Sequence, residues 1–394
     1  MEYFNWKIKS VNYGNIGAAC MVTPLALRGT RRSDLGWMPA LGAGASESYG
    51  RKRARRVAVM VPMSGSAGIW GPSCISCAQL AIDEINRADG VSGQEIEPIL
   101  LDADDSVLDD AAATLAELID DRAVDAIVGM HVSSVRQRLT GVVAGRIPYV
   151  YTPLYEGGEH SPSVFAIGET PREQLEPAVR RLAELYKARR WALVGNDYIW
   201  PRVSNRHAKA CLKEAGGEVV FEEYVPFGLE EPVDLVERLA AARPDIVLLT
   251  LVGQEAVEFN RIFGAMNLDR AIVRFSTAIE ENVLLAAGAE NTRRLYGASS
   301  YFSTLKTQRN LAFKERYHAF HRERAPVLNA IGQSIYEGMH FFASLARQPH
   351  RSGGAPVDYT SARGGRFFSN DRKDNPIYLA RADGHLFSVV AQLD

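Results

Sequence analysis

The loop that follows a short apolar run in the middle of the chain carries polar and aromatic side chains suited to binding a small molecule. Its sequence is Asn196-Asp-Tyr-Ile-Trp-Pro-Arg202, directly after Trp191-Ala-Leu-Val-Gly195. The apolar run is typical of a buried strand in a parallel sheet, and a helical pattern follows the loop. Ligands of open α/β sheets lie beyond the carboxyl ends of the strands. With two similar strand-end loops upstream, this arrangement indicates a small-molecule binding cleft.

The other motifs that could take part in catalysis do not match those of known enzymes. The loop Ser64-Gly-Ser-Ala-Gly-Ile-Trp-Gly71 matches neither a dinucleotide-binding nor a phosphate-binding loop. No G-x-S-x-G elbow comes with His and Asp in a suitable order. The acidic cluster at 102–105 is more typical of a solvated turn than of a cation site. The pair Cys74-x-x-Cys77 lacks the further ligands that zinc needs, so packing thiols are expected. We therefore expect no enzyme, no cofactor and no metal site.

Composition limits the class of protein. The chain has 394 residues, enough for two domains that each bury a core. It is 46% hydrophobic and 23% charged with a net charge of −2, and no basic stripe predicts a nucleic-acid partner. Its 4 cysteines are too few for a disulfide scaffold. No run of about 18 apolar residues predicts a transmembrane helix.

Residues 1–55 differ from the rest because they are basic, glycine-rich and aperiodic. They predict a disordered tail or a degenerate targeting segment. Two candidate export signals are weak, since Pro24 interrupts the apolar core of one and Pro39 that of the other. The lack of a clean signal favours a cytoplasmic location, with a periplasmic or cell-surface location as the alternative.

From residue 56 onward, strands and helices alternate in a way that predicts an α/β fold with two Rossmann-like lobes and parallel sheets. Strands are expected at 57–61, 97–102, 126–128, 149–152, 191–195, 218–224, 246–251 and 272–276. Helices are expected at 73–87, 108–120, 134–144, 172–186, 203–215, 232–242 and 255–265. Two such series in tandem place a cleft between the lobes.

The remaining elements complete this division. The N-terminal lobe is expected to comprise 56–170 plus 298–345, with a strand at 298–301 and one long helical pattern over 311–345. The C-terminal lobe is expected over 171–297. Residues 346–394 are expected to form strands that pack across the hinge, with a hairpin at Asp383-Gly384. The run 347–355 is expected to be a surface loop.

From about Arg56 to the end, the chain resembles type I periplasmic binding proteins. Within this family, it resembles the branch that comprises the amide sensors of amidase operons and the urea or short-amide receptors of ABC importers. Four blocks carry the resemblance, in order and at family spacing over some 340 residues. They are Pro62-Met-Ser-Gly-Ser-Ala-Gly68 with Asp83-Glu-Ile-Asn86 and Gly90-Val-Ser-Gly93; Tyr151-Thr-Pro-Leu-Tyr-Glu-Gly157 with Ser161-Pro162; Asn196–Arg202 with Ser204-Asn205; and Gly216-Gly-Glu-Val219. The resemblance implies three crossover segments and a ligand enclosed as the lobes close.

The resemblance also implies ligand contacts. Ser133 would exchange hydrogen bonds with the ligand's polar head, Tyr151 would supply a wall or hydroxyl contact, and Tyr198 would close from the second lobe. A selective amide pocket needs matched hydrogen bonds and flat apolar walls in a dry space. Two positions depart from the amide sensors: His131 replaces a tyrosine, and the threonine contact would come from Thr152 or be lost. A histidine there would favour a ligand with a carboxylate, so an amino acid or a longer amide stays open.

Several candidates have a structural alternative: Tyr151 as a core aromatic, Tyr198 as a brace of the hinge and His131 as a core or rim histidine. Five further candidates follow. Tyr155 is either a ligand wall or a core aromatic, Ser64 a ligand contact or a helix cap, and Trp70 a lid or a surface anchor. Gln254 and Glu280 are nominated only because they follow strands of the second lobe.

Two functions share this binding event. A cytosolic sensor would use lobe closure to control a regulatory protein, whereas an importer receptor would present its closed form to ABC permease subunits. The poor export signal favours the sensor, and the abundance of importer receptors in the family favours the receptor. We prefer the sensor by a small margin. The ligand is a short amide, urea or an amino-acid-like solute, with branched-chain amino acids within the range, and a homodimer is left open.

Overall fold

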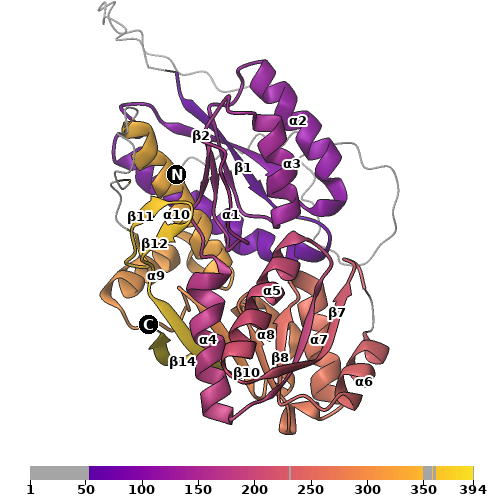
Figure 1. Cartoon of the computed structure of the whole chain (residues 1–394). Helices are drawn as coiled ribbons and strands as arrows, with labels where there is room; N and C mark the ends of the chain where they lie inside the picture. Colours follow the sequence, from indigo (N-terminus) through magenta and orange to yellow (C-terminus); the bar gives the residue numbers. More distant parts are fainter. Residues whose placement is uncertain (1–52, 230–231, 349–356, 358–360, 394) are drawn as a thin grey trace, which may run out of the picture.

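The computed structural model describes residues 53–229, 232–348, 357 and 361–393 (Figure 1). The predicted tail lies outside the described residues as far as residue 52, and so does most of the predicted loop 347–355. Two sheets, each covered by helices, form an upper and a lower lobe in Figure 1. The predicted α/β class and two-lobed architecture are confirmed. Within the described residues, no helix is both long and apolar enough to span a membrane.

The first lobe contains a parallel five-stranded sheet in the order β2-β1-β3-β4-β5. Its strands are β1 (Arg55–Val61), β2 (Ile96–Asp102), β3 (Ala126–Gly129), β4 (Tyr149–Tyr151) and β5 (Val164–Ala166). Its helices are α1 (Gly71–Arg87), α2 (Leu108–Asp120), α3 (Ser133–Val143), α9 (Gln308–His321) and α10 (Ala330–Arg347). The orange α9 and α10 return from late in the chain to pack against the indigo α1 (Figure 1).

The second lobe contains a seven-stranded sheet in the order β14-β13-β10-β9-β8-β6-β7. Its strands are β6 (Arg190–Asn196), β7 (Glu218–Val225), β8 (Ile246–Thr250), β9 (Val273–Ser276), β10 (Leu295–Ser299), β13 (Ile377–Asp383) and β14 (Leu386–Leu393). Its helices are α4 (Pro171–Tyr186), α5 (Ile199–Glu214), α6 (Val233–Ala241), α7 (Gly253–Ala265) and α8 (Glu281–Ala287). Alternate side chains along β6 and β8 enter two different hydrophobic clusters, because a buried parallel strand is apolar on both faces.

Three segments cross between the lobes: 167–170, 300–307 and the chain between α10 and β13. The first ends in a capping box, in which Thr170 and Glu173 satisfy each other's backbone N–H groups at the start of α4. The third includes the short ribbon of β11 (Phe367–Ser369) and β12 (Arg372–Lys373). Asn370, in the turn of this ribbon, bonds the backbone of Val164 and Ala166 in β5.

Three features differ from the sequence analysis. The strand expected at 298–301 in the first lobe is wrong, because β10 pairs with β9 and β13 in the second sheet. The single helical pattern over 311–345 is two helices, since Arg322 adopts a left-handed φ of 54° and Pro326 cannot continue a helix. Helix α5 starts at Ile199, ahead of the expected 203, because Pro201 is tolerated in a first turn. The hairpin is confirmed, with Gly384 at φ 63° in its turn.

Candidate ligand-binding site

A small cavity with mostly buried lining residues lies between the lobes, where the carboxyl ends of their strands meet. Its lining residues follow β1, β3, β4, β6, β8 and β9, with one contribution from the start of α10. They are Trp70, His131, Val132, Ser133, Tyr151, Pro153, Leu154, Tyr198, Trp200, Val252, Ala278, Glu280 and Ile331. The space open to the centre of a water molecule is about 20 Å³, room for about one water, so the cleft is nearly shut.

Six residues nominated from the sequence line this cavity together: Trp70, His131, Ser133, Tyr151, Tyr198 and Glu280. Ser133 is the first residue of α3, and no side chain caps the N-terminus of that helix. Backbone N–H groups in the first turn of a helix lack intrahelical partners and favour a carbonyl or an anion. The first lobe therefore offers hydrogen-bond donors to a ligand at Ser133.

Tyr151 forms the wall beside Ser133. Its hydroxyl donates to the carbonyl oxygen of His131 at 2.8 Å and lies 3.4 Å from Ser133 Oγ. Burial raises the pKa of Tyr151, so the phenol stays neutral. Tyr155 packs edge-on behind it, with ring centroids 6.4 Å apart, and the guanidinium of Arg136 lies over both rings. These contacts fix the position of the Tyr151 ring.

The second lobe supplies an acceptor and further aromatic walls. Glu280 precedes α8, is buried, and accepts a hydrogen bond from the indole N–H of Trp70 at 3.2 Å. Burial, with a smaller contribution from neighbouring Glu281, raises the pKa of Glu280 to about 8. Tyr198 lies beside Trp200 and Phe227, with ring centroids 6.3 and 5.4 Å away.

His131 is buried and both of its ring nitrogens face protein groups. Its Nε2 lies 2.9 Å from the hydroxyl of Tyr149, and its Nδ1 lies 3.2 Å from the carbonyl of Val132. Burial lowers the pKa of His131 to about 3, so the ring is neutral at physiological pH. A charge on this ring therefore gives no support to the expectation that His131 favours a ligand with a carboxylate.

Four nominated residues lie outside the cavity. Ser64 donates to Asp102 at 2.6 Å at the end of β2, and Gln254 is bonded to Glu258 on the surface of α7. Thr152 faces Ser334 of α10 at 3.1 Å, which explains why the threonine contact is not at the ligand wall. Tyr155 donates to the carbonyl of Asn370 at 2.8 Å and supports the cavity from behind.

The sequence analysis missed the apolar part of the lining. Pro153, Leu154 and Trp200 belong to motifs that it quoted, so their positions were available as a signal. Ile331 is brought to the cavity by α10 from a distant part of the chain, and no local pattern could place it there.

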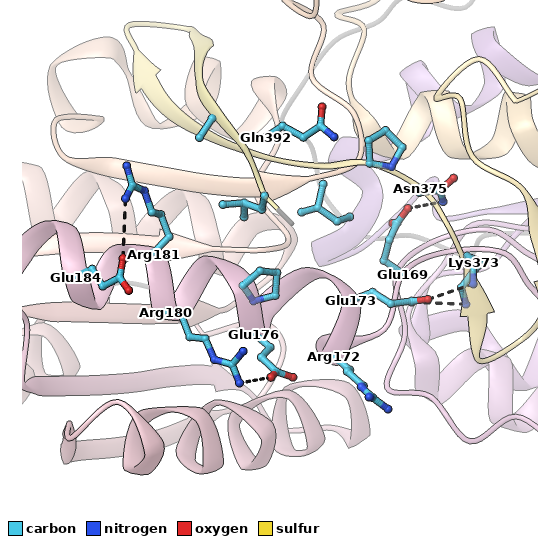
Figure 2. A pocket seen from close by; sticks show the side chains of 15 residues that line it. Glu169, Arg172, Glu173, Glu176, Arg180, Arg181, Glu184, Lys373, Asn375 and Gln392 are labelled. Carbon is cyan, nitrogen blue, oxygen red and sulfur yellow. Dashed lines mark hydrogen bonds and ion pairs between the residues drawn. The ribbon is translucent and has the colours of Figure 1, made fainter.

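A larger hollow than this cavity lies elsewhere in the second lobe. An open groove of about 720 Å³ runs between α4 and the strands β12 to β14 (Figure 2). Its charged rim is largely paired internally, as in Arg180 with Glu176, Arg181 with Glu184 and Glu169 with Asn375. The groove therefore offers few charges to a ligand. Among the described residues, no group of three or more His, Cys, Asp or Glu side chains could hold a metal.

Comparison with known proteins agrees with this geometry. A family model described as periplasmic binding protein matches residues 55–383. The chain belongs to the periplasmic binding protein family.

Individual relatives are more distant. A Leu/Ile/Val-binding protein from Citrobacter freundii is 24% identical over 196 residues, which cover 49% of this chain and 53% of that protein. The match thus spans about half the length of this relative. Among solved structures, a substrate-binding protein of a branched-chain amino acid transporter from Streptococcus pneumoniae, in complex with isoleucine, aligns with a TM-score of 0.74 at 20% identity, covering 86% and 99% of the two chains.

A solute-binding protein of an ABC transporter from Rhodopseudomonas palustris HaA2, in complex with p-hydroxybenzoic acid, has the same TM-score of 0.74 at 16% identity, covering 86% and 97%. These structural likenesses show the shared fold. The comparisons support the importer-receptor alternative better than the cytosolic sensor preferred from the sequence, and they give no support to a cytoplasmic location.

Proposed function

We propose that this chain is the extracytoplasmic receptor of an ABC importer and binds a small solute that has a hydrogen-bond acceptor at one end and N–H donors at the other. The observation that carries the proposal is that two polar groups line the same cavity. They are Ser133, at the uncapped start of α3, and the buried carboxyl group of Glu280. Family membership supports the importer role, in which the closed form of the protein would bind the permease subunits.

Short amides, urea and small amino acids all fit this description. Their carbonyl or carboxylate would accept from the hydroxyl and backbone N–H of Ser133, and their nitrogen would donate to Glu280. The flat rings of Tyr151 and Tyr198 would enclose the remainder.

Binding without chemical conversion also agrees with the site. The imidazole of His131 is engaged by Tyr149, and the hydroxyl of Ser133 faces Tyr151 at 3.4 Å rather than a general base. Within the described cavity lining, no activated nucleophile is assembled.

A thermal-shift screen tests the proposal, because a ligand that binds only the folded state raises the melting temperature. The panel is acetamide, propionamide, urea, glycine, alanine, isoleucine and 4-hydroxybenzoate. We expect a saturable shift with one of the small amides, urea or the small amino acids. A shift with 4-hydroxybenzoate alone, or no shift with any compound, would contradict the proposed ligand class.

A further inference from the structure

Outside the ligand cavity, the two lobes are joined by hydrogen bonds to one buried carboxylate. Glu255 lies in the first turn of α7 in the second lobe and is 3% exposed. Its Oε1 accepts from the hydroxyl of Ser66, which follows β1 in the first lobe, at 2.6 Å. The same oxygen accepts from the backbone N–H of Gly228, in the second lobe, at 2.6 Å. None of these three residues lines the ligand cavity.

The backbones of the lobes also touch at this point. Gly253 has a φ of 58°, and a Cβ atom added there would lie 2.2 Å from the carbonyl oxygen of Ser66. The obstacle is main chain, which cannot rotate away as a side chain can. Close by, Asn282 of α8 donates to the carbonyl of Ile69 at 3.0 Å. The close approach of the lobes therefore depends on a residue without a side chain at position 253.

We propose that Ser66 and Glu255 form an interlobe latch that sets the proportion of closed molecules, and thereby the ligand affinity, without touching the ligand. A carboxylate removed from water is costly unless donors replace the water. In the closed form Ser66 supplies one of the two donors, and opening the lobes would separate it from Glu255. Apparent affinity scales with the fraction of molecules in the binding-competent form, so the latch raises it.

The structural half of this inference can be tested on the full chain without any added ligand. Small-angle X-ray scattering measures the radius of gyration, which rises when the lobes separate. Ser66→Ala and Gly253→Ala are expected to be more extended than the wild type. Gly216→Ala is the matched control for Gly253→Ala, because Gly216 is also left-handed, with a φ of 72°, but has no atom within 4 Å of an added Cβ.

Ser134→Ala is the control for Ser66→Ala, since its hydroxyl is bonded to Asp105 within the first lobe. Circular dichroism checks that each variant is folded. If Gly253→Ala does not fold, the test rests on Ser66→Ala alone. The latch would be overturned if Ser66→Ala, and Gly253→Ala where it is folded, had the same radius of gyration as the wild type and the controls.

The affinity half rests on the proposed function. With whichever panel compound binds the wild type, calorimetry should show about tenfold weaker binding to Ser66→Ala and unchanged binding to Ser134→Ala. Equal affinities would overturn the claim that the latch sets affinity. If no compound binds, the proposed ligand class fails, while the scattering result still decides whether the latch exists.

Discussion

Trp70 of the first lobe donates its indole N–H to the carboxyl group of Glu280 in the second lobe, across 3.2 Å. Both side chains are buried and both line the ligand cavity. This hydrogen bond crosses the cleft at the site where a ligand nitrogen is proposed to bind. The protonation of Glu280 is therefore linked both to the stability of the closed form and to the kind of ligand accepted.

The stability of the protein should depend on pH through Glu280. Its pKa is about 8 when folded and about 4.5 ordinarily, so the folded state holds a proton that the unfolded state has lost between these values. Stabilisation from this group is complete below about pH 4.5 and is lost as the pH rises through 8. Between pH 6.5 and 8, the free energy of unfolding should fall by about 1 kcal/mol per pH unit.

Guanidinium chloride unfolding of the wild type and Glu280→Gln at several pH values checks this expectation. His131 adds a small slope of the opposite sign near pH 6.5, because its pKa is lowered to about 3 in the folded protein while the unfolded state still binds a proton there. This slope is common to both proteins and cancels in the comparison. The variant should show a smaller slope than the wild type. Identical slopes would mean that Glu280 is ionised in the folded protein.

The pH dependence of binding should reveal the charge of the ligand. A ligand with an ammonium group needs the ionised form of Glu280, so its affinity should rise as the pH increases from 6 to 8. Binding should release about one proton at pH 6 and less at pH 8. A neutral amide can bind the protonated carboxyl group and should show no such rise. Calorimetry in buffers of different ionisation enthalpy measures the proton release directly.

Removal of the hydroxyl of Ser133 should weaken binding selectively. Ser133→Ala should lower the affinity about tenfold, the usual effect of losing one hydrogen bond in a dry site. Ser134→Ala is the control, because its hydroxyl bonds Asp105 on the exposed side of the same helix. Equal affinities for the two variants would remove Ser133 from the binding site.

Gly338 of α10 should resist replacement, because an added Cβ atom would lie 2.3 Å from the Thr152 methyl and 2.9 Å from Val128. We expect Gly338→Ala to destabilise the protein by about 1–2 kcal/mol, since overpacking outweighs the gain in helix propensity. Gly141→Ala in α3, where the added atom meets nothing within 4 Å, should be neutral or stabilising. Chemical denaturation compares them, and a stabilised Gly338→Ala would show that this contact relaxes without cost.

Arg136 should be important for stability as well as for the position of Tyr151. Its buried guanidinium pairs with Glu156 at 2.5 Å and also with Glu159. Arg136→Met leaves two buried carboxylates without their cation and should cost about 3–5 kcal/mol. Arg138→Met, on the same helix with an exposed partner at 3.5 Å, should change stability by less than about 1 kcal/mol. Equal losses for the two variants would contradict the buried-pair account.

Local patterns predicted most of the fold because each strand and helix of the alternating region has its own apolar periodicity. The helix at 108–120 was predicted with the observed bounds. Strand β10 was assigned to the wrong lobe, because its short sequence does not specify which sheet it joins. Its partners, β9 and β13, are decided by tertiary packing.

The candidate site was predicted only in part, because local patterns give the position of a residue and not the direction of its side chain. Strand-end loops gave Ser133, Tyr151 and Tyr198 through the family motifs, and the cavity does bring them together. Gln254 follows β8 as expected, but its side chain points to the surface and bonds Glu258. Topology places a residue near the cleft, whereas only packing decides which way its side chain points.

The most direct test of the central claim is a crystal structure of the full chain with whichever panel compound gives the largest thermal shift. We predict ligand density between Ser133 and Glu280, enclosed by Tyr151 and Tyr198. Density in the groove between α4 and β14, with the interlobe cavity unchanged, would contradict the account.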